Sequence, residues 1–355
     1  MIDYLIVGSG LAGIAFAEYA QRNQKSILVF DNDSSQSSKV AGGLYNPVIL
    51  KRFSGLSGAQ AQLDEMNRFY SWVENKLDNK FNTPLAVLRR FNSVEEQNNW
   101  FAAADKPILS PFLSVKLITK AYEHIESPFG FGEVLQTGAV DTARFLEKYR
   151  GYLKANQCFV EGTFDYSLLE FRKTGVSYNK IEARHIVFAE GFGIRNNPFF
   201  KDLPLSGTKG ELLVIKAPEL SLDAIVKTNI FVLPLGESLF KVGATYNWDD
   251  KTETPTPEAR AELIGKIKET INCDFEIVSQ LAGIRPTVKD RKPLLGTHHE
   301  HRNLHVLNGL GTRGVMLAPT MAKLLLDHIE NRTPLPPEVD ISRFGASWPH
   351  SGRNA

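Results

Sequence analysis

The stretch Gly8-Ser9-Gly10-Leu11-Ala12-Gly13 follows directly on the apolar run Leu5-Ile6-Val7. Apolar positions at helical spacing come next, and a second apolar run, residues 26–30, ends on Asp31. This order predicts a strand, a glycine-rich turn, a helix and a second parallel strand within residues 2–31.

The three glycines of this stretch have separate physical roles. Gly8 permits a tight strand-to-helix turn, Gly10 lets the backbone approach a pyrophosphate, and Gly13 lets the helix pack closely on the strand. A diphosphate would then sit on free N–H groups at the positive end of the helix, around Leu11 and Ala12. The stretch predicts a dinucleotide site; a tight turn without a nucleotide is the alternative.

The acidic residue at the end of the second strand adds to this prediction. Asp31 lies 18 residues after Gly13. Its carboxylate can accept hydrogen bonds from both ribose hydroxyls, which favours an adenosine ribose without a 2′-phosphate.

Three later segments bear on the identity of the dinucleotide. The pair Gly42-Gly43 presents bare backbone that suits a large planar ring or its ribityl chain. A buried strand at 185–188 runs into Ala189 and Gly191. The third segment is Ala282 to Gly296, followed by a strand at 304–307 and a glycine-rich loop before an apolar helix from Met316 to Ile329.

Together these segments resemble the D-amino-acid-oxidase-like superfamily of flavoproteins, which includes glycine oxidase and sarcosine oxidase. The resemblance spans nearly the whole chain and implies FAD as the cofactor. It also implies that the last glycine loop leads into a helix whose N-terminus faces the flavin pyrimidine, where the helix dipole would stabilise reduced flavin. In this loop it implies cofactor contacts from Gly309, Gly311, Thr312, Arg313, Gly314 and Val315. Because residues 309–314 contain no Cys or His, we expect the FAD to be bound non-covalently.

The resemblance also implies the domain organisation. We expect an α/β fold in which a Rossmann-like FAD-binding domain is interleaved with a mixed-sheet α+β substrate domain. The first is assembled from residues 1–78, 139–205 and 283–335, and the second from 79–138 and 206–282. Residues 336–355 form a C-terminal tail that we expect to fray from about Ser347.

Arg285 is the first candidate for the substrate site. In the family an arginine in a Gly-x-Arg-Pro turn forks onto a substrate carboxylate, a task that suits a guanidinium with two parallel donors. The alternative is a structural arginine paired with an acid such as Asp290. Glycine oxidase also places a tyrosine hydroxyl near the carboxylate, but the matching position here is Phe231, which cannot donate. Either Tyr45 or Tyr246 supplies the missing donor, or each is a core aromatic.

Three further segments contain basic residues, and each has a functional and a structural interpretation. Arg313 contacts substrate or flavin, or else is a solvent-exposed turn residue. Lys51-Arg52 lines the entrance to the site, or, as we expect, is a solvated pair. The run His298-His299-Glu300-His301 suggests a metal cluster, but consecutive spacing sends side chains in diverging directions, so we expect a solvated loop and no metal site.

Composition limits the remaining possibilities. The chain has 355 residues, a formal net charge of +1 and two cysteines without metal-ligand spacing. The near-neutral charge argues against a general nucleic-acid binder, and the cysteine usage favours a reducing cytoplasm. The N-terminus begins a strand without a signal-peptide pattern, and no apolar run reaches the roughly 18 residues of a membrane span.

These observations predict an FAD-dependent oxidoreductase that oxidises the C–N bond of a small amine or amino acid by hydride transfer to flavin N5. The electron acceptor is dioxygen or another oxidant. One similarity is closer than the rest: residues 243–246, 289–296 and 309–314 look like the oxidase half of the bifunctional enzyme that finishes 5-methylaminomethyl-2-thiouridine in tRNA. The alternative function is therefore removal of a carboxymethyl group from a modified wobble uridine, although the charge does not favour tRNA as a partner. A 2-hydroxy acid dehydrogenase and a non-catalytic flavin-binding module are further alternatives.

Overall fold

The N-terminal glycine-rich stretch forms the strand–turn–helix–strand unit that its sequence predicts. In the computed structural model, which describes residues 1–347, β1 (Ile2–Val7) leads through the glycine turn into α1 (Leu11–Arg22). The following strand, β2 (Ile27–Asp31), lies parallel to β1 with Phe30 opposite Val7. The two strands and the helix bury apolar side chains in one core. Both strands lie inside the first sheet, next to each other.

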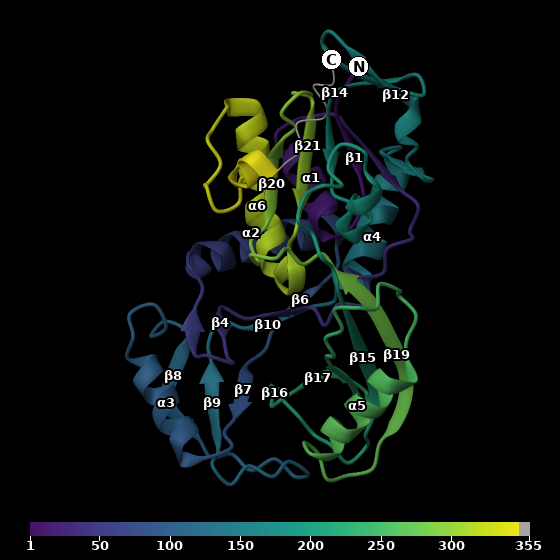
Figure 1. Ribbon diagram of the computed structural model, residues 1–355. Helices are drawn as coiled ribbons and strands as arrows, with labels where there is room; N and C mark the ends of the chain where they lie inside the picture. The colour runs from purple at the N-terminus through teal and green to yellow at the C-terminus, as the bar shows by residue number, and fades with distance from the viewer. Residues whose placement is uncertain (348–355) are drawn as a thin grey trace.

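Eight strands form this first sheet (Figure 1). Its parallel part has the order β11-β2-β1-β14-β21, since β14 pairs in parallel with β1 and with β21. Strands of such a parallel part are buried on both faces, which explains their continuous apolar runs. The strands besides β1 and β2 are β11 (Phe159–Glu161), β12 (Leu169–Arg172), β13 (Gly175–Tyr178), β14 (Ile181–Phe188), β20 (Leu294–Thr297) and β21 (Leu304–Asn308).

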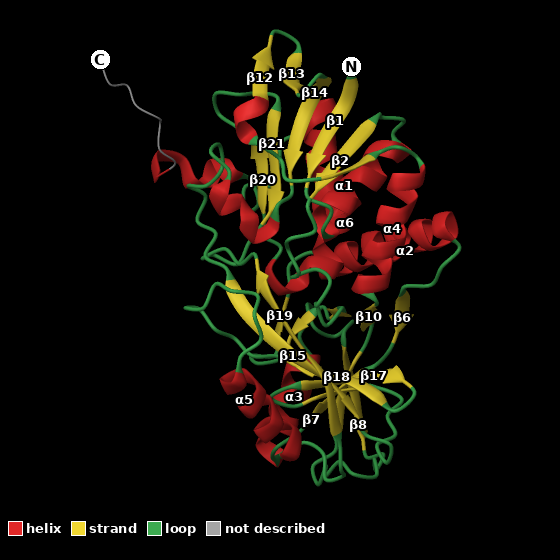
Figure 2. Cartoon of the chain, turned by 90° about the vertical axis from the view of Figure 1, so that its right-hand side faces the viewer, coloured by secondary structure: helices red, strands yellow, loops and turns green. Residues whose placement is uncertain are grey.

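Four helices lie together beside this sheet (Figure 2). They are α1, α2 (Ala59–Leu77), α4 (Thr142–Ala155) and α6 (Gly314–Asn331). The apolar face of α1 packs between β1 and α6, and the aromatic rings of Phe69, Tyr70 and Phe145 fill the space between α2 and α4. A second core, built around Phe164, Phe188 and neighbouring apolar residues, forms separately from this one.

A second eight-stranded sheet lies below the first in Figure 1. Its order is β19-β15-β18-β17-β16-β7-β9-β8, mostly antiparallel, with β16 and β7 parallel. The strands are β7 (Val87–Arg90), β8 (Leu113–Ile118), β9 (Phe131–Val134), β15 (Thr208–Lys216), β16 (Ile225–Lys227), β17 (Phe231–Gly236), β18 (Leu239–Gly243) and β19 (Glu276–Arg285). The carboxyl end of β19 points up toward the first sheet, and this places Arg285 between the two sheets.

The smaller elements connect or cover these sheets. A three-stranded sheet joins β3 (Leu44–Tyr45), β10 (Gly138–Val140) and β6 (Asn82–Pro84), and β4 (Val48–Ile49) pairs with β5 (Ser54–Gly55). The remaining helices are α3 (Val94–Ala104), α5 (Pro257–Lys268) and short 3₁₀ turns η1 (Tyr166–Leu168), η2 (Gly191–Asn196), η3 (Gly311–Arg313) and η4 (Ile341–Ser347). The mixed α/β fold class is confirmed.

Local helix and turn signals explain several of these boundaries. The hydroxyl of Thr256 accepts a hydrogen bond from the Ala259 N–H at 3.3 Å, so α5 begins as its N-cap and first-turn proline predict, and it ends at Lys268. The turn at Gly236-Glu237 joins β17 and β18, which pair as antiparallel neighbours.

The strands of the first sheet come from residues 2–31, 159–188 and 294–308, and those of the second from 87–134 and 208–285. On the basis of this distribution we propose that the chain is divided into two interleaved domains. Fraying is predicted from about Ser347; the residues after it, 348–355, lie outside the described residues. None of the helices in residues 1–347 combines the length and apolar character needed to cross a membrane.

Candidate active site

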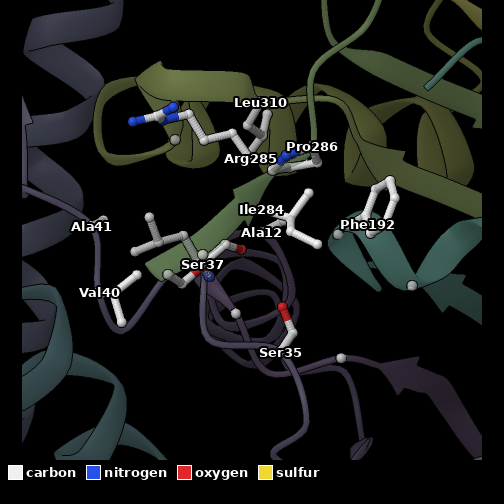
Figure 3. A pocket seen from close by; sticks show the side chains of 18 of the residues that line it. Ala12, Ser35, Ser37, Val40, Ala41, Phe192, Ile284, Arg285, Pro286 and Leu310 are labelled. Atoms are coloured by element: carbon white, nitrogen blue, oxygen red, sulfur yellow. Dashed lines mark hydrogen bonds between the residues drawn. The ribbon is translucent and has the colours of Figure 1, made fainter. Parts of the chain in front are cut away.

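A cavity of about 700 Å³ lies where the two sheets meet. Its walls combine the carboxyl ends of β1, β2 and β14, the loop at residues 34–44, the β17–β18 hairpin, the end of β19 and the start of α6. Carboxyl ends of parallel strands are the usual ligand-binding edge of an open α/β sheet. In Figure 3, the Arg285 side chain points away from Phe192.

The start of α1 forms one wall. Gly8 has a φ of 101°, and a Cβ there would lie 2.4 Å from the Ala189 carbonyl oxygen, so only glycine fits this turn. A Cβ on Gly13 would lie 1.9 Å from the Gly8 carbonyl oxygen. The N-cap, Gly10, has no side chain that could cap α1, and the first N–H group, that of Leu11, donates a long hydrogen bond of 3.4 Å to the Ser38 hydroxyl. The start of α1 is therefore suited to a ligand anion.

Gly8, Gly10, Leu11 and Ala12 line the cavity, whereas Gly13 lies behind its wall. The glycine-rich stretch therefore lies at the cavity as predicted. Gly13 does not face the cavity and contributes by letting the turn pack closely.

Asp31 lies beside this turn and lines the same cavity. Its Oδ2 accepts a hydrogen bond from the Ser9 hydroxyl at 2.7 Å, and Arg150 Nη2 lies 3.7 Å from the same oxygen. Arg150, on α4, also donates to the Ser9 carbonyl at 3.3 Å, while its Nε is buried without a partner among residues 1–347. Sequence reasoning missed Arg150, because nothing local to α4 marks it.

The loop after β2 supplies the glycine pair predicted for a planar ring. Gly43 has a φ of 76°, and a Cβ there would lie 2.1 Å from the Val140 carbonyl oxygen. A Cβ on Gly42 would lie 2.8 Å from the Phe231 ring. Both glycines line the cavity, and Lys241 holds the preceding Ala41 carbonyl at 3.2 Å.

The turn after β14 brings Ala189 and Gly191 to the cavity. Between them, Glu190 is held by Tyr166 and by the Asn197 amide at 2.7 Å. Burial raises the pKa of the Glu190 carboxyl to about 7, and the hydrogen bonds from Tyr166 and Asn197 oppose that rise.

The loop before α6 forms the opposite wall. Gly311, Thr312, Gly314 and Val315 line the cavity, and Arg313, the N-cap of α6, has no side-chain capping bond. Gly309 does not line it: with a φ of 73° and a Cβ position 2.6 Å from Val288, it shapes the turn beneath the loop.

Arg285 reaches the cavity from the end of β19. Its Nη1 donates to the carbonyl of Thr245 at 3.2 Å and to that of Lys209 at 3.4 Å. Burial lowers the pKa of its guanidinium. Within residues 1–347 no carboxylate pairs with Arg285, and the alternative of an ion pair with Asp290 is wrong, because Asp290 pairs with Arg343 at 2.9 Å.

The two tyrosines occupy different places. Tyr45 is only 4 % exposed, belongs to the core between α2 and the three-stranded sheet, and does not line the cavity. Tyr246 does line it, and its ring lies under the Arg285 guanidinium. Phe231, at the position expected to lack a donor, lines the wall beside Gly42.

The basic residues singled out in the sequence also lie in different places. Arg313 lines a smaller neighbouring cavity together with Lys227, a residue that sequence reasoning missed. Lys51 and Arg52 are exposed and line neither cavity.

The segment 298–301 is a loop in which His299 and Glu300 are exposed, as expected, but the expectation that its side chains diverge is wrong. His298 is only 7 % exposed, and its ring stacks on His299 and His301 with centroids 4.4 and 5.0 Å apart. The chain bends back after β20, so neighbouring rings converge and His301 stacks on Phe171. In the described part of the chain, no group of three or more His, Cys, Asp or Glu side chains could hold a metal ion.

The residues of the main cavity fit an FAD. The uncapped start of α1 suits a diphosphate, Asp31 suits a ribose, and the bare backbone of Gly42-Gly43 suits a planar ring. The uncapped start of α6 suits the negative charge of a reduced ring.

Comparisons with known proteins agree with this fit. Residues 3–328 match the DAO family model, described as FAD dependent oxidoreductase. Glycine oxidase of Bacillus subtilis (strain 168) is 22 % identical over 356 residues, with 93 % of each chain covered. The tRNA 5-methylaminomethyl-2-thiouridine biosynthesis bifunctional protein MnmC of Idiomarina loihiensis is 27 % identical over 222 residues, which cover 58 % of this chain and 34 % of that protein.

Among solved structures, glycine oxidase from Geobacillus kaustophilus superposes with a TM-score of 0.76 at 18 % identity, covering 94 % of this chain and 95 % of that one. This likeness concerns the fold, whereas the family model spans both the glycine turn of α1 and the loop before α6. The chain therefore belongs to the DAO family of FAD-dependent oxidoreductases.

Proposed function

We propose that this protein oxidises a small amine or amino acid that carries a carboxylate, at the C–H bond next to the nitrogen. The observation that carries the proposal is Arg285: a half-buried guanidinium at the cavity, held by two carbonyl groups and paired with no carboxylate in residues 1–347. A buried cation without a counter-ion is costly, so it marks a place for an anionic ligand.

Arg285 would anchor the substrate by its carboxylate. The Thr245 and Lys209 carbonyls take only its Nη1, which leaves other N–H groups for a charge-assisted, forked interaction. The Tyr246 ring beneath the guanidinium limits its rotation. The substrate is thereby held by one end while its C–H bond is aimed into the cavity.

Bound FAD, which we expect to be non-covalent, supplies the acceptor for a hydride from that C–H bond. The substrate nitrogen must be neutral to release the hydride, and water then cleaves the resulting imine into an amine and a carbonyl acid. The acidic residues of the cavity wall are engaged elsewhere: Asp31 with Ser9, Glu190 with Tyr166 and Asn197, and Glu253 with the Gln36 N–H at 3.1 Å. We therefore assign no general base.

The experiment is a turnover assay on the purified, FAD-loaded protein with matched substrates. Glycine, sarcosine, D-alanine and N-carboxymethyl amines are compared with 2-hydroxy acids of the same carbon skeleton, with dioxygen and with an artificial acceptor. The proposal predicts a carbonyl acid and a released amine from the amines. Turnover of the hydroxy acids alone would contradict it and support the dehydrogenase alternative.

A second candidate is removal of a carboxymethyl group from a modified wobble uridine in tRNA. It is supported by the match to part of the MnmC protein, which covers 58 % of this chain. The same Arg285 would hold the N-carboxymethyl carboxylate. This candidate predicts turnover of RNA that bears the modified nucleoside and none of the small amines.

A further inference from the structure

A second cavity of about 280 Å³ adjoins the main one. The two share Leu44, Lys227, Phe231 and Thr312 as lining residues, so they meet at this wall. Two cations, Lys227 and Arg313, line the second cavity, and its lining, which lies wholly within the described chain, includes no Asp or Glu.

Lys227 is the more unusual of the two. It ends β16, opposite Arg89 of β7 and Phe231 of β17, and its ammonium makes no ion pair within residues 1–347. Burial, with the nearby charges of Arg89 and Lys266, lowers the pKa of Lys227 to about 8. Arg89 is already paired with Glu96 at 2.6 Å, so the strand pair offers Lys227 no counter-charge.

Arg313 approaches from the other side, at the end of η3 and the start of α6. Its Nη2 donates to the Arg291 carbonyl at 3.3 Å, a neutral partner, and burial lowers the pKa of its guanidinium. Two half-buried cations thus line one small cavity, Lys227 from β16 of the second sheet and Arg313 from the turn that leads into α6.

A half-buried cation without a counter-ion loses hydration and gains no charge partner in return, so a structural role alone gives no reason to place two of them at this cavity. We propose that the second cavity binds an anionic group of the substrate, so that the preferred substrate is a small amine with two anionic arms, one held by Arg285 and the other by Lys227 and Arg313.

This inference rests on the proposed function, and it narrows the substrate class. Arg285 and Lys227 both line the main cavity, at β19 and at β16 respectively, so both are open to a ligand in that cavity. The nitrogen and its C–H bond then lie between the two anchors. The apolar walls at Leu44 and Phe231 suit the methylene groups of the second arm.

The test compares N-(2-carboxyethyl)glycine with N-propylglycine, which has nearly the same shape and lacks the second carboxylate. Dissociation constants are measured by calorimetry on the FAD-loaded protein, and anaerobic flavin bleaching is followed separately. We expect the dicarboxylate to bind roughly 10- to 100-fold more tightly, the range for a hydrogen bond to a charged group. Lys227→Met should remove this preference by lowering the affinity for the dicarboxylate much more than that for N-propylglycine, and Lys227→Arg should restore part of it.

Lys216→Met is the matched control, because Lys216 is exposed at the far end of β15 and lines neither cavity. Arg313→Met should selectively weaken binding of the dicarboxylate, as Lys227→Met does. Equal affinity for both ligands in the unchanged protein, or equal losses for both in Lys227→Met, would overturn the inference. So would recognition of only an RNA stem-loop carrying an N-carboxymethyl nucleoside. A dicarboxylate preference without any bleaching would support the anion site and contradict the proposed function, so the two failures are distinct.

Discussion

The guanidinium carbon of Arg285 lies 4.4 Å from the centroid of the Tyr246 ring. The ring belongs to a residue that is 63 % exposed, so it forms an outer wall of the cavity and not part of a core. Together with the Thr245 carbonyl at 3.2 Å, it orients the cation with neutral groups only. The positive charge of Arg285 is therefore left for a substrate.

Replacement of Arg285 should abolish this anchor. Arg285→Met should lower kcat/KM for a carboxylated amine. The corresponding loss of transition-state stabilisation should be at least about 2 kcal/mol, the scale of a charge-assisted hydrogen bond. Arg285→Lys should recover only part of the loss, because an ammonium cannot form the fork. Steady-state kinetics and the bound-flavin spectrum are measured together. Unchanged kinetics in Arg285→Met would show that the carboxylate binds elsewhere.

The position of the Arg285 side chain depends on Gly210. A Cβ at Gly210 would lie 1.9 Å from Arg285 Nη2, the far end of a flexible side chain. Gly210→Ala should therefore displace the guanidinium and raise KM without loss of FAD. Gly265→Ala on α5 is the control, since a Cβ there meets nothing within 4 Å. Equal KM values for the two variants would contradict this relationship.

Tyr246 distinguishes a ring platform from a hydroxyl donor. If the ring orients Arg285, Tyr246→Phe should leave KM nearly unchanged, and Tyr246→Ala should cost about 0.5–2 kcal/mol in substrate binding. KM values for the three proteins decide between these roles. Equal damage from Phe and Ala would instead assign the hydroxyl as the missing carboxylate donor.

The glycine turn should control cofactor binding. A Cβ at Gly13 would lie 1.9 Å from the backbone oxygen of Gly8, which cannot move without opening the turn. Gly13→Ala should therefore weaken FAD binding, measured by flavin fluorescence on dilution. Gly151→Ala on α4, where a Cβ meets nothing within 4 Å, should retain FAD. If Gly13→Ala retained FAD as well as the unchanged protein, the role assigned to this glycine would be contradicted.

Three histidines link β14, β21 and α6 and should make the fold sensitive to acid. His185 contacts His305 at 3.0 Å, and Thr297 contacts His305 at 2.9 Å and His328 at 3.3 Å. Burial, followed by the neighbouring histidines, holds the pKa of His305 well below its usual value. The unfolded chain therefore binds a proton below about pH 6.5 that the folded chain does not.

The free energy of unfolding should accordingly fall as the pH drops below about 6.5, and His305→Gln should flatten that dependence. Chemical denaturation at a series of pH values measures it, with His124→Gln, in a turn between β8 and β9, as the control. An unaltered slope in His305→Gln would contradict the assignment.

Local sequence signals predicted the parts of the fold that depend on local chemistry. The glycine turn, its helix and Asp31 were predictable because each residue type is required by backbone geometry or by a neighbour within the βαβ unit. Thr256 and Pro257 predicted the start of α5 for the same reason.

Contacts between distant segments could not be predicted in this way. Arg150 reaches Ser9 across 141 residues, and Lys227 joins the site only because β16 pairs with β7 and β17. The histidines at 298–301 were misjudged because spacing along the chain says nothing of a bend that brings their rings together. Tyr45 was ambiguous for a related reason: whether an aromatic ring faces a cavity or a core depends on which helix covers it.

The most direct test of the account is anaerobic titration of the FAD-loaded protein with sarcosine and longer N-substituted glycines, while the visible flavin band is recorded. The account predicts saturable bleaching by these amines, a slower rate when the methylene next to the carboxylate is deuterated, and loss of bleaching in Arg285→Met. A flavin band that no carboxylated amine bleaches, or that bleaches as fast in Arg285→Met as in the unchanged protein, would contradict the central claim.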